Sequence, residues 1–540
     1  MNRITYLFKN IKIVVARVLF CLIYFSLPIK VLSQSIIYPL EFFEDISLTP
    51  NALSDYSFPI STSNREAQAF FDQGLQLYYS FDKLDAARSF RQAQSADPNC
   101  AICYWGEAIA WGANLNRPMS MREAPRAYLA INKAKENIKY SNEKEASLIR
   151  ALDVRYISNY TYSSRKNLDQ AYANAMRDVV EKYPNDTDIA TIYAHALFLL
   201  DEVINDLTFD NSRFLRLFEL LQDSLSKNEL HIGACHLFIH AVASTNQANL
   251  GEECAHFLSE TPAGVSHMIH MSSHIWIAQG KWREAVESNL RAIEIDQISE
   301  TGEGYSVLPI HNLEMLIFSA IMDGQKKLAL ETAQDLYALA QNPTYYLLTL
   351  IRFGHFDDIS VEINMRENTV EKSIWYFSQG YAALKKGDMD NTKLFLSNLE
   401  KQLEEPRTQF RGNDSRFVIG ALAALLKGEI ELTKNSFNTA INYFTSSVSF
   451  YDQLDFGDPD ILPFSPRHWL GEAYLLDGEF ILAKETFKED LAQHPANGWS
   501  LMGLLNAYKN LEMPLELEAV KLQFNQQWSR SDVVLESSKF

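Results

Sequence analysis

The 540-residue sequence carries none of the common catalytic signatures. There is no Walker loop, no glycine-rich dinucleotide fingerprint, no HExxH pair and no GxSxG turn, which argues against the familiar nucleotide-binding, metalloprotease and hydrolase families. One SxxK match, residues 80–83, falls in an expected turn between helices and is attributed to chance, because the accompanying penicillin-binding motifs are missing. Strand patterns are nearly absent too, so the sequence predicts an all-α protein.

Positive charge is also scarce. The chain has 49 Lys and Arg against 68 Asp and Glu, which gives a formal net charge of −19. An acidic surface of this kind repels phosphate backbones and anionic headgroups. We therefore expect no nucleic-acid partner and no attachment to an anionic membrane surface.

The N-terminus has the pattern of a cleaved export signal. Basic residues precede an apolar run over residues 18–29, and Val31-Leu32-Ser33 supplies a small-residue cleavage site. A transmembrane anchor is the alternative, but the run is short and contains Pro28. We predict a signal peptide over residues 1–33, an exported protein that is periplasmic or extracellular, and no integral membrane segment after cleavage. The mature chain would carry a formal charge of −24.

Cysteine is rare, with five residues in the chain. Cys21 lies inside the signal, so Cys100, Cys103, Cys235 and Cys254 remain. Cys100 and Cys103 form a CxxC pair that no histidine follows, which argues against haem attachment, and no second CxxC exists to complete a zinc ribbon. Buried thiols or a local disulfide, which export permits, are preferred over a redox site.

A repeated helix-pair pattern runs through most of the chain. Gly74, Ala86, Phe90, Ala93 and Pro98 fall at positions 8, 20, 24, 27 and 32 of a repeat of about 34 residues. The same offsets recur near the C-terminus in Gly471, Tyr474, Gly478, Ala483, Phe487 and Pro495. These are the positions of the tetratricopeptide repeat (TPR), in which each helix pair buries its apolar stripe against the next pair. The sequence predicts a TPR solenoid of about ten helix pairs with a concave groove.

The predicted organisation follows these repeats. Residues 34–64, which contain three prolines, are expected to form an extended lead-in. N-terminal TPR repeats are predicted over 65–230, His-rich central repeats over 231–323 and C-terminal repeats over 324–540.

Histidine is concentrated in the central repeats. Seven of the 12 histidines fall in one 44-residue window, namely His231, His236, His240, His256, His267, His270 and His274. His236 and His270 are 34 residues apart, and so are His240 and His274. That separation is the repeat period, so these residues occupy the same two positions of consecutive repeats.

The first helix of each repeat is expected to turn these residues toward the concave groove. His267, His270 and His274 take repeat positions 2, 5 and 9, and offsets of three, four and seven residues share one helix face. In the next repeat His311 and Glu314 take positions 2 and 5. Two repeats before His267, His195 falls near position 9. The predicted wall consists of His236, His240, His267, His270, His274, His311 and Glu314.

Six histidines of this wall are candidate metal ligands: His236, His240, His267, His270, His274 and His311. Imidazoles that converge in one groove suit Zn, Cu, Fe or Ni, and an HxxxH pair on one helix is a common two-ligand unit. Glu314 is the candidate ligand or general base for a metal-activated water. The alternative is that the histidines bind or stack on a peptide, or satisfy one another. His231 and His256 lie off this face and are expected to be surface or packing residues.

The chain resembles a family of exported bacterial TPR proteins, generally without an assigned activity. The motifs that carry the resemblance are Asp97-Pro98-Asn99-Cys100-Ala101 followed by Tyr104-Trp105-Gly106, residues 236–241, residues 267–274 and Asn497-Gly498-Trp499-Ser500-Leu501. The resemblance extends over about residues 71–511. It departs at Ala243, where the family tends to carry an acidic residue, and at Glu314, where it often reads Asn-Leu-His.

Two functions remain open from the sequence. The first is an exported scaffold that binds a protein, peptide or small-molecule ligand in its groove. The second is a metalloprotein or metalloenzyme, hydrolytic or oxidative, with the histidine cluster as its metal site. Enzymatic activity is not assigned at this point.

Overall fold

The computed structural model describes residues 45–49, 51–204, 206–260, 264–360, 369–454, 457 and 459–540. The predicted signal peptide and residues 34–44 of the lead-in lie outside this range. Within it the chain is almost entirely helical, and its strands are the two-residue segments β1 (Gln409–Phe410) and β2 (Asn413–Asp414), which pair antiparallel. The predicted all-α class is confirmed. None of the helices in the described ranges has the length and apolar character needed to cross a membrane.

The helices follow one another with short connections. The N-terminal repeats contain α2 Arg65–Tyr79, α3 Lys83–Ala96, α4 Ala101–Trp111, α5 Ala124–Asn137, α6 Glu143–Asp153, α7 Arg165–Lys182, α8 Thr187–Phe198, α9 Asp201–Ile204 and α10 Ser212–Lys227. The central repeats contain α11 Ile232–Val242, α12 Glu252–Glu260, α13 Ser266–Ala278, α14 Trp282–Ser299 and α15 Pro309–Met322.

The C-terminal part continues in the same way. It contains α16 Lys326–Ala340, α17 Thr344–Arg352, α18 Thr369–Lys385, α19 Met389–Lys401, α20 Ser415–Thr433, α21 Phe437–Tyr451, α22 Arg467–Asp477, α23 Phe480–Gln493, α24 Gly498–Asn510 and α25 Pro514–Gln527. Short 3-10 turns are η2 Ile138–Tyr140, η3 Tyr162–Ser164, η4 Ala248–Gly251 and η5 Phe356–Ser360.

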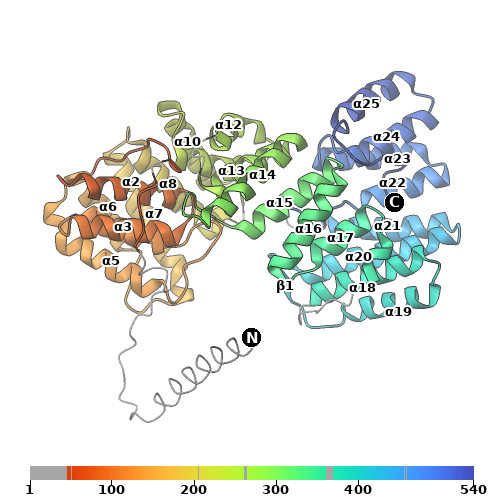
Figure 1. The fold of residues 1–540 in the computed structure, drawn as a ribbon, viewed down its shortest axis with the longest axis horizontal. Coiled ribbons are helices and arrows are strands. Elements are labelled where there is room, and N and C mark those ends of the chain that lie inside the picture. The colour runs from red at the N-terminus through yellow and green to blue at the C-terminus, as the bar shows by residue number, and fades with distance from the viewer. Residues whose placement is uncertain are drawn as a thin grey trace, which may run out of the picture. The chain divides into compact units, whose positions relative to one another are not determined.

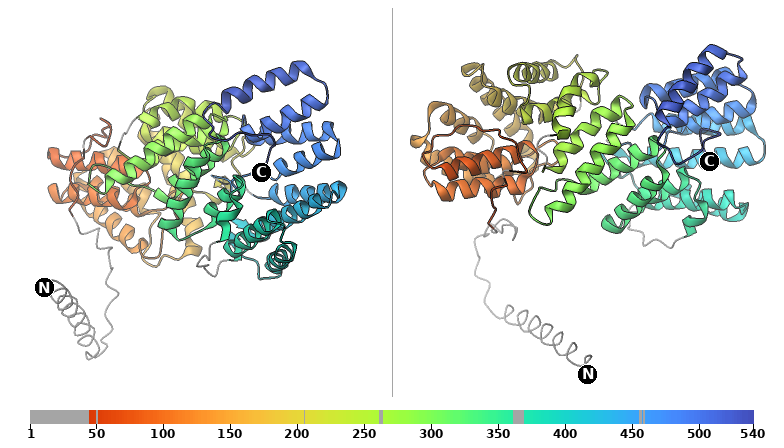
Figure 2. Two further views of the ribbon diagram at one scale, coloured as in Figure 1. Left: turned by 45° about the vertical axis from the view of Figure 1, so that its right-hand side comes forward. Right: turned by 45° about the horizontal axis from the view of Figure 1, so that its top comes forward.

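Consecutive helices pack as hairpins, and each hairpin packs against the next (Figures 1 and 2). The Phe90 ring lies between two glycines: a Cβ at Gly74 of its own pair would come within 2.9 Å of it, and one at Gly106 of the next pair within 2.3 Å. Phe487 is held in the same way, since a Cβ at Gly471 would lie 2.4 Å from its ring. The glycine and phenylalanine positions read from the sequence therefore make the contacts that join repeat to repeat.

The sequence pattern places one helix pair of the N-terminal repeats differently from the structure. One copy, from Tyr172 to Leu200, is expected in a stretch where the structure has two pairs, α6 with α7 and α8 with α10. The expected copy combines α7, which is the second helix of one pair, with α8, which is the first helix of the next pair. Neither α6 nor α8 contains glycine, so the consensus small position does not mark where these pairs begin.

The described part of the lead-in, before α2, has turns and irregular backbone and lies against the first helices of the early pairs. Gln73 Nε2 of α2 donates to the Ser47 carbonyl oxygen at 3.1 Å. The Ser61 amide donates to Glu145 Oε1 of α6 at 2.6 Å. The face on which an open groove was expected is therefore covered by the chain itself in the N-terminal repeats.

The four cysteines outside the predicted signal form two disulfides. Cys100 is bonded to Cys103 at the start of α4, and Cys235 of α11 is bonded to Cys254 of α12. Of the alternatives that the sequence allowed for these residues, the structure contains the disulfide. The second bond ties together the two helices of a pair in the His-rich block.

Candidate metal centre

Three first helices in succession, α11, α13 and α15, bring six histidines together. They form two groups of three, His236 with His240 and His267, and His270 with His274 and His311. Within each group, one ligand nitrogen per residue lies within 4.8 Å of the others. Helix α13 serves both groups, because His267 joins the pair from α11, while His270 and His274 join the residue from α15.

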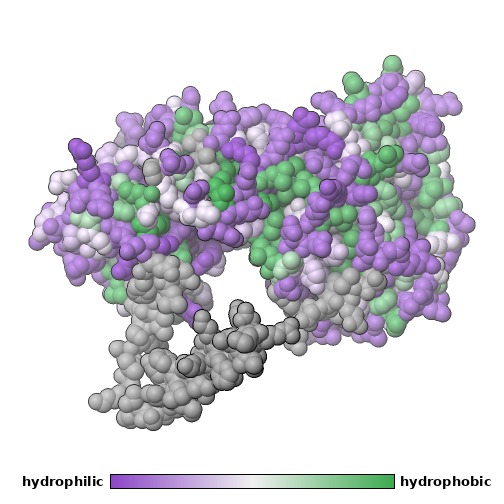
Figure 3. Space-filling view, in the orientation of Figure 1, coloured by the Kyte–Doolittle hydropathy of each residue, from purple (hydrophilic) through white to green (hydrophobic). Residues whose placement is uncertain are grey.

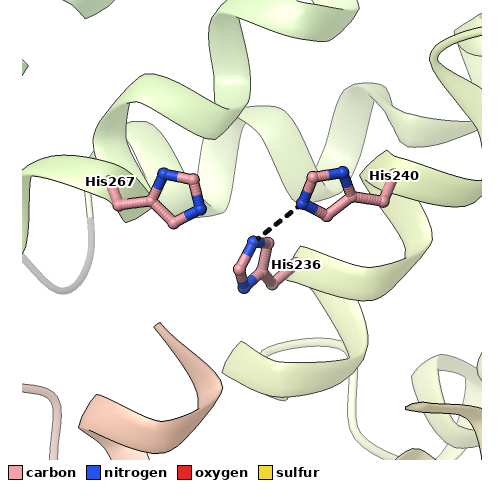
Figure 4. Close-up of side chains that lie close together, drawn as sticks. All are labelled: His236, His240 and His267. Carbon is pink, nitrogen blue, oxygen red and sulfur yellow. Dashed lines mark hydrogen bonds between the residues drawn. The ribbon is translucent and has the colours of Figure 1, made fainter. Parts of the chain in front are cut away.

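The three rings of the first group face a common centre (Figure 4). His236 Nε2 and His240 Nε2 lie 3.2 Å apart, and the ring centroids of His236 and His267 are 5.0 Å apart. Two nitrogens bound at about 2.0–2.1 Å to one tetrahedral ion are separated by about 3.3 Å. The spacing of the HxxxH pair is therefore already that of two ligands of one ion.

The second group repeats this arrangement one repeat later. His270 Nε2 and His274 Nε2 lie 2.9 Å apart. His311 enters from α15, and its ring centroid is 4.6 Å from that of His270. All three nitrogens again come from neighbouring helices. The two HxxxH pairs are one 34-residue period apart, whereas the third members, His267 and His311, are 44 residues apart.

Hydrogen bonds at the other ring nitrogens orient two of these histidines. His236 Nδ1 lies 2.5 Å from the backbone carbonyl of Tyr79, and His270 Nδ1 lies 2.8 Å from Asn289 Oδ1. Both partners accept, so each Nδ1 carries the proton and each Nε2 keeps its lone pair toward the group. Metal-ligating histidines are commonly held by a carbonyl or amide oxygen in this way.

Burial keeps four of the six imidazoles neutral. It lowers the pKa of His236 to about 4, and it lowers the pKa values of His240, His267 and His270 well below the ordinary value for histidine. For the last three, neighbouring histidines lower the pKa further, because adjacent imidazolium charges would repel. Neutral imidazole is the form that binds a metal.

Two side chains that the sequence did not single out as site residues enclose the first group. Phe81, in the turn between α2 and α3, places its ring centroid 4.3 Å from that of His236. Its φ of 63° is in the left-handed region, which is unusual for a bulky residue. Asn116 Nδ2 lies 3.4 Å from His267 Nε2, across 151 residues of sequence. Both belong to turns of other pairs, and no spacing in the sequence connects them to the histidines.

Glu314 lies outside both groups in the described part of the chain. Its Oε2 is 3.9 Å from His311 Nδ1 and 3.4 Å from Arg411 Nη2. The Arg411 guanidinium also donates to the Tyr345 hydroxyl at 2.6 Å. Glu314 therefore lies next to His311 and is paired with Arg411, and its role as a ligand or general base stays a prediction.

The remaining histidines of this region have other partners. His195 of α8 is buried, with its Nδ1 2.7 Å from the Tyr78 hydroxyl. His231 is also buried, with its Nε2 3.2 Å from an oxygen of Asp188. His256 is exposed. The prediction that His231 and His256 lie off the site face is confirmed.

Comparisons with known proteins place the chain only at the level of fold. No protein-family model matches it, and no curated protein sequence matches it. Among solved structures it is similar to yeast Tom70 (13% identity over 87% of this chain and 93% of that chain, TM-score 0.25). It is also similar to a human IFIT1 dimer with PPP-AAAA (12%, 91% and 98%, TM-score 0.33) and to the P58(IPK) TPR domain (12%, 86% and 96%, TM-score 0.23).

These identities and TM-scores carry no inference about what the chain binds or does. The fold is established by the contacts inside the chain, above all by the aromatic rings held between glycines of successive pairs. The protein is an all-α helical-repeat protein of the TPR type.

Proposed function

We propose that this protein is an exported metalloprotein whose central repeats hold two transition-metal ions, one in each three-histidine group. The observation that supports it is the convergence of six histidine nitrogens from three helices into two groups of three, each within 4.8 Å. Three protein ligands leave one coordination position for water or a substrate. That number is typical of catalytic zinc sites, whereas structural sites use four.

The ligand set favours copper. Neutral imidazole suits copper, zinc, iron and nickel, whereas carboxylate and carbonyl oxygens suit magnesium, calcium and manganese. In the described residues neither group includes a carboxylate. A buried centre with uncharged ligands disfavours a high positive charge, and copper(I) brings half the charge of a divalent ion. Copper(II) also stands at the top of the affinity order of the divalent ions.

The two disulfides support export. Disulfides form and persist in oxidising compartments and are rare in the cytosol. Four cysteines in two bonded pairs, Cys100 with Cys103 and Cys235 with Cys254, therefore agree with the signal peptide expected over residues 1–33. We assign the mature protein to the periplasm or the extracellular medium.

Metal content by mass spectrometry tests the proposal. The purified mature protein is incubated separately with copper, zinc, iron and nickel, and is expected to retain two copper ions per chain. His236→Ala/His240→Ala and His270→Ala/His274→Ala are each expected to retain one. The control His256→Ala/His355→Ala removes two histidines that lie outside both groups and should retain two ions.

Two results would contradict the proposal. One is a wild-type protein that retains none of the four metals while its circular dichroism shows a folded chain. The other is equal metal loss in the control and in the two site variants, since retention would then not depend on these groups.

The last helix pair favours a second role as a partner-binding scaffold. Helix α25 leaves Leu515 83% and Leu522 71% exposed, and apolar atoms lie on the surface over α24 and α25 (Figure 3). Exposed apolar side chains that share a helix face indicate a protein partner. Leu515→Glu/Leu522→Glu is expected to abolish crosslinking to that partner and to leave metal content unchanged; undiminished crosslinking would exclude this face.

A further inference from the structure

A cavity of about 320 Å³ lies beside the second three-histidine group. One side is formed by α13 and α15, and includes His274 and Phe318. The other side belongs to the C-terminal repeats and includes Tyr451, Asp460 and His494. Its volume is near the lower end of the range of about 300–1,000 Å³ that is usual for ligand pockets.

The two sides are joined by packing outside the cavity. Trp282 Nε1, in the helix that follows α13, donates to the Pro495 carbonyl oxygen at 3.0 Å, across 213 residues of sequence. A Cβ at Gly280 would lie 2.2 Å from the same carbonyl oxygen, so the two backbones are in close contact there. The cavity is thus enclosed by a contact between distant parts of one array.

Most of the cavity wall is apolar. Besides Phe318, the side chains of Ile277, Ala278, Leu454 and Ile461 line it. Such a wall gains free energy by burying the hydrocarbon part of a ligand and offers it no charge.

The polar end of the cavity is internally neutralised. Asp460 Oδ2 accepts a hydrogen bond from the Tyr451 hydroxyl at 2.6 Å and lies 2.7 Å from His494 Nε2. That contact raises the pKa of His494 to about 10 against the effect of burial, so an imidazolium faces the carboxylate. Asp452, also on the wall, is paired with Arg467 at 2.7 Å.

Each charged side chain on the described wall thus has an oppositely charged partner within the protein, and His494 is shared by two carboxylates, Asp460 and Asp490. A charged ligand would lose its hydration without gaining a counter-ion. A neutral molecule has a smaller hydration to lose, and one hydroxyl or amide can hydrogen-bond to the carboxylate oxygens at the polar end.

The cavity also reaches the proposed metal site. His274 lines the cavity, and its Nε2 is 2.9 Å from His270 Nε2 in the second group. A molecule in the cavity would therefore contact a residue that holds the ion.

We propose that this cavity binds a small, uncharged and mainly apolar organic molecule with one hydrogen-bonding group, such as an aromatic alcohol, next to the metal of the second group. The proposal rests on the proposed function and deepens it, because it names the class of molecule on which that metal would act. The three-histidine groups themselves do not define that class.

Binding of 2-naphthol to the copper-loaded, full mature chain tests the proposal by calorimetry. The probe has an apolar ring system and one hydroxyl, and 2-naphthoate carries the same rings with a negative charge. Ala278→Trp and Leu454→Trp fill the cavity from its two sides. Leu339→Trp, at a position 60% exposed on α16, is the matched control.

The wild type and Leu339→Trp are expected to bind 2-naphthol at least tenfold more tightly than 2-naphthoate. Both filling variants should bind it at least tenfold more weakly while they retain the same copper. Addition of the probe should shift the visible absorption of the copper(II) form of the wild type and leave that of the filling variants unchanged.

The possible failures are distinguishable. Copper retention without naphthol binding, or naphthol binding that both folded filling variants preserve, overturns the cavity proposal and leaves the metal proposal standing. Equal affinity for naphthol and naphthoate overturns the assignment of an uncharged ligand. Naphthol binding by a chain that retains no copper overturns the metal proposal and with it the link between the cavity and a metal.

Discussion

Two buried histidine clusters of this protein differ in whether carboxylates accompany them. In the three-histidine groups, burial lowers the pKa of His236 to about 4. In the C-terminal repeats, His494 lies between Asp460 and Asp490, which overcome the effect of burial and raise its pKa to about 10. The same side chain, equally buried, is thus neutral in one place and a cation in the other.

The difference separates a ligand site from a structural one. Asp490 accepts from Ser500 Oγ at 2.6 Å and from Asn497 Nδ2 at 3.1 Å, and lies 3.1 Å from His468 Nε2, so it ties α22, α23 and α24 together. His494 has committed both ring nitrogens, Nε2 to Asp460 and Nδ1 to Asp490. A histidine among other neutral histidines keeps a lone pair for a metal.

Acid unfolding of the metal-free protein should be the largest effect. Burial is the main cause that lowers the pKa values of five histidines in the folded state, namely His195, His236, His240, His267 and His270. Once unfolded they bind protons below about pH 6.5. The free energy of unfolding therefore has its full value above about pH 6.5. It decreases as the pH falls, by up to about 1.4 kcal/mol per pH unit for each histidine.

Circular dichroism of the metal-free chain should show unfolding between about pH 6 and pH 4, since total stability is only about 5–15 kcal/mol. His236→Gln/His270→Gln removes two of the titrating groups and should make the transition less steep. An equally steep transition in that variant would mean that other groups drive it.

Alkaline pH should weaken the other cluster. The pKa of His494 is about 10 in the folded state. Its contribution to the free energy of unfolding is therefore fully present below about pH 6.5 and is lost as the pH rises from there through the folded-state pKa of about 10. The loss amounts to about 5 kcal/mol at most. Urea unfolding at intervals from pH 7 to 10 should show this decline in the wild type and a flatter profile in His494→Gln; parallel profiles would refute the assignment.

Removing one charge of the structural cluster should lower the free energy of unfolding somewhat less than deprotonation of His494 does. Asp490→Asn leaves the His494 cation with one carboxylate fewer in a buried setting, and the loss of one partner of a buried pair costs about 3–5 kcal/mol. Urea unfolding at neutral pH measures the change. A loss below about 1 kcal/mol would show that Asp490 is not essential to this cluster.

A smaller effect is expected when an orienting partner of the metal groups is removed. Asn289 Oδ1 lies 2.8 Å from His270 Nδ1, and loss of such a partner typically lowers metal affinity about 10–100-fold. Competition titration with a copper chelator should show Asn289→Ala weakened at one site and unchanged at the other. Equal weakening at both sites would mean that the two groups are not separate.

The smallest effect is expected for Glu314→Gln. The Glu314 carboxylate is partly exposed, is paired with Arg411 and lies 3.9 Å from His311. Surface pairs contribute about 0–1 kcal/mol, so stability should change by less than about 1 kcal/mol and both copper ions should remain. Loss of one copper ion in this variant would show that Glu314 is a metal ligand.

The helix pairs could be read from the sequence because their signals are local and periodic. Gly74 and Phe90, and likewise Gly471 and Phe487, have fixed spacings and pack as those spacings imply. In the stretch from α6 to α10, the expected copy over residues 172–200 combined α7 with α8, whereas the structure pairs α6 with α7 and α8 with α10.

The histidines could be predicted as candidates but not as two groups. The 34-residue spacing and the shared helix face placed all six on neighbouring first helices. The sequence does not show that His267 joins the α11 residues while His270 and His274 join His311. That division depends on how each helix is rotated against its neighbours, which side-chain packing decides.

The amino-acid pattern alone determined the all-α repeat and the face that carries the histidines, because both follow from the helix period and the repeat period. The tertiary structure decided that burial keeps His236, His240, His267 and His270 neutral, that Phe81 and Asn116 enclose the first group, and that a cavity meets His274. These properties come from residues such as Asn116 and His267 that lie 151 positions apart. Burial and hydrogen bonding are made by such distant contacts, and no local spacing in the chain records them.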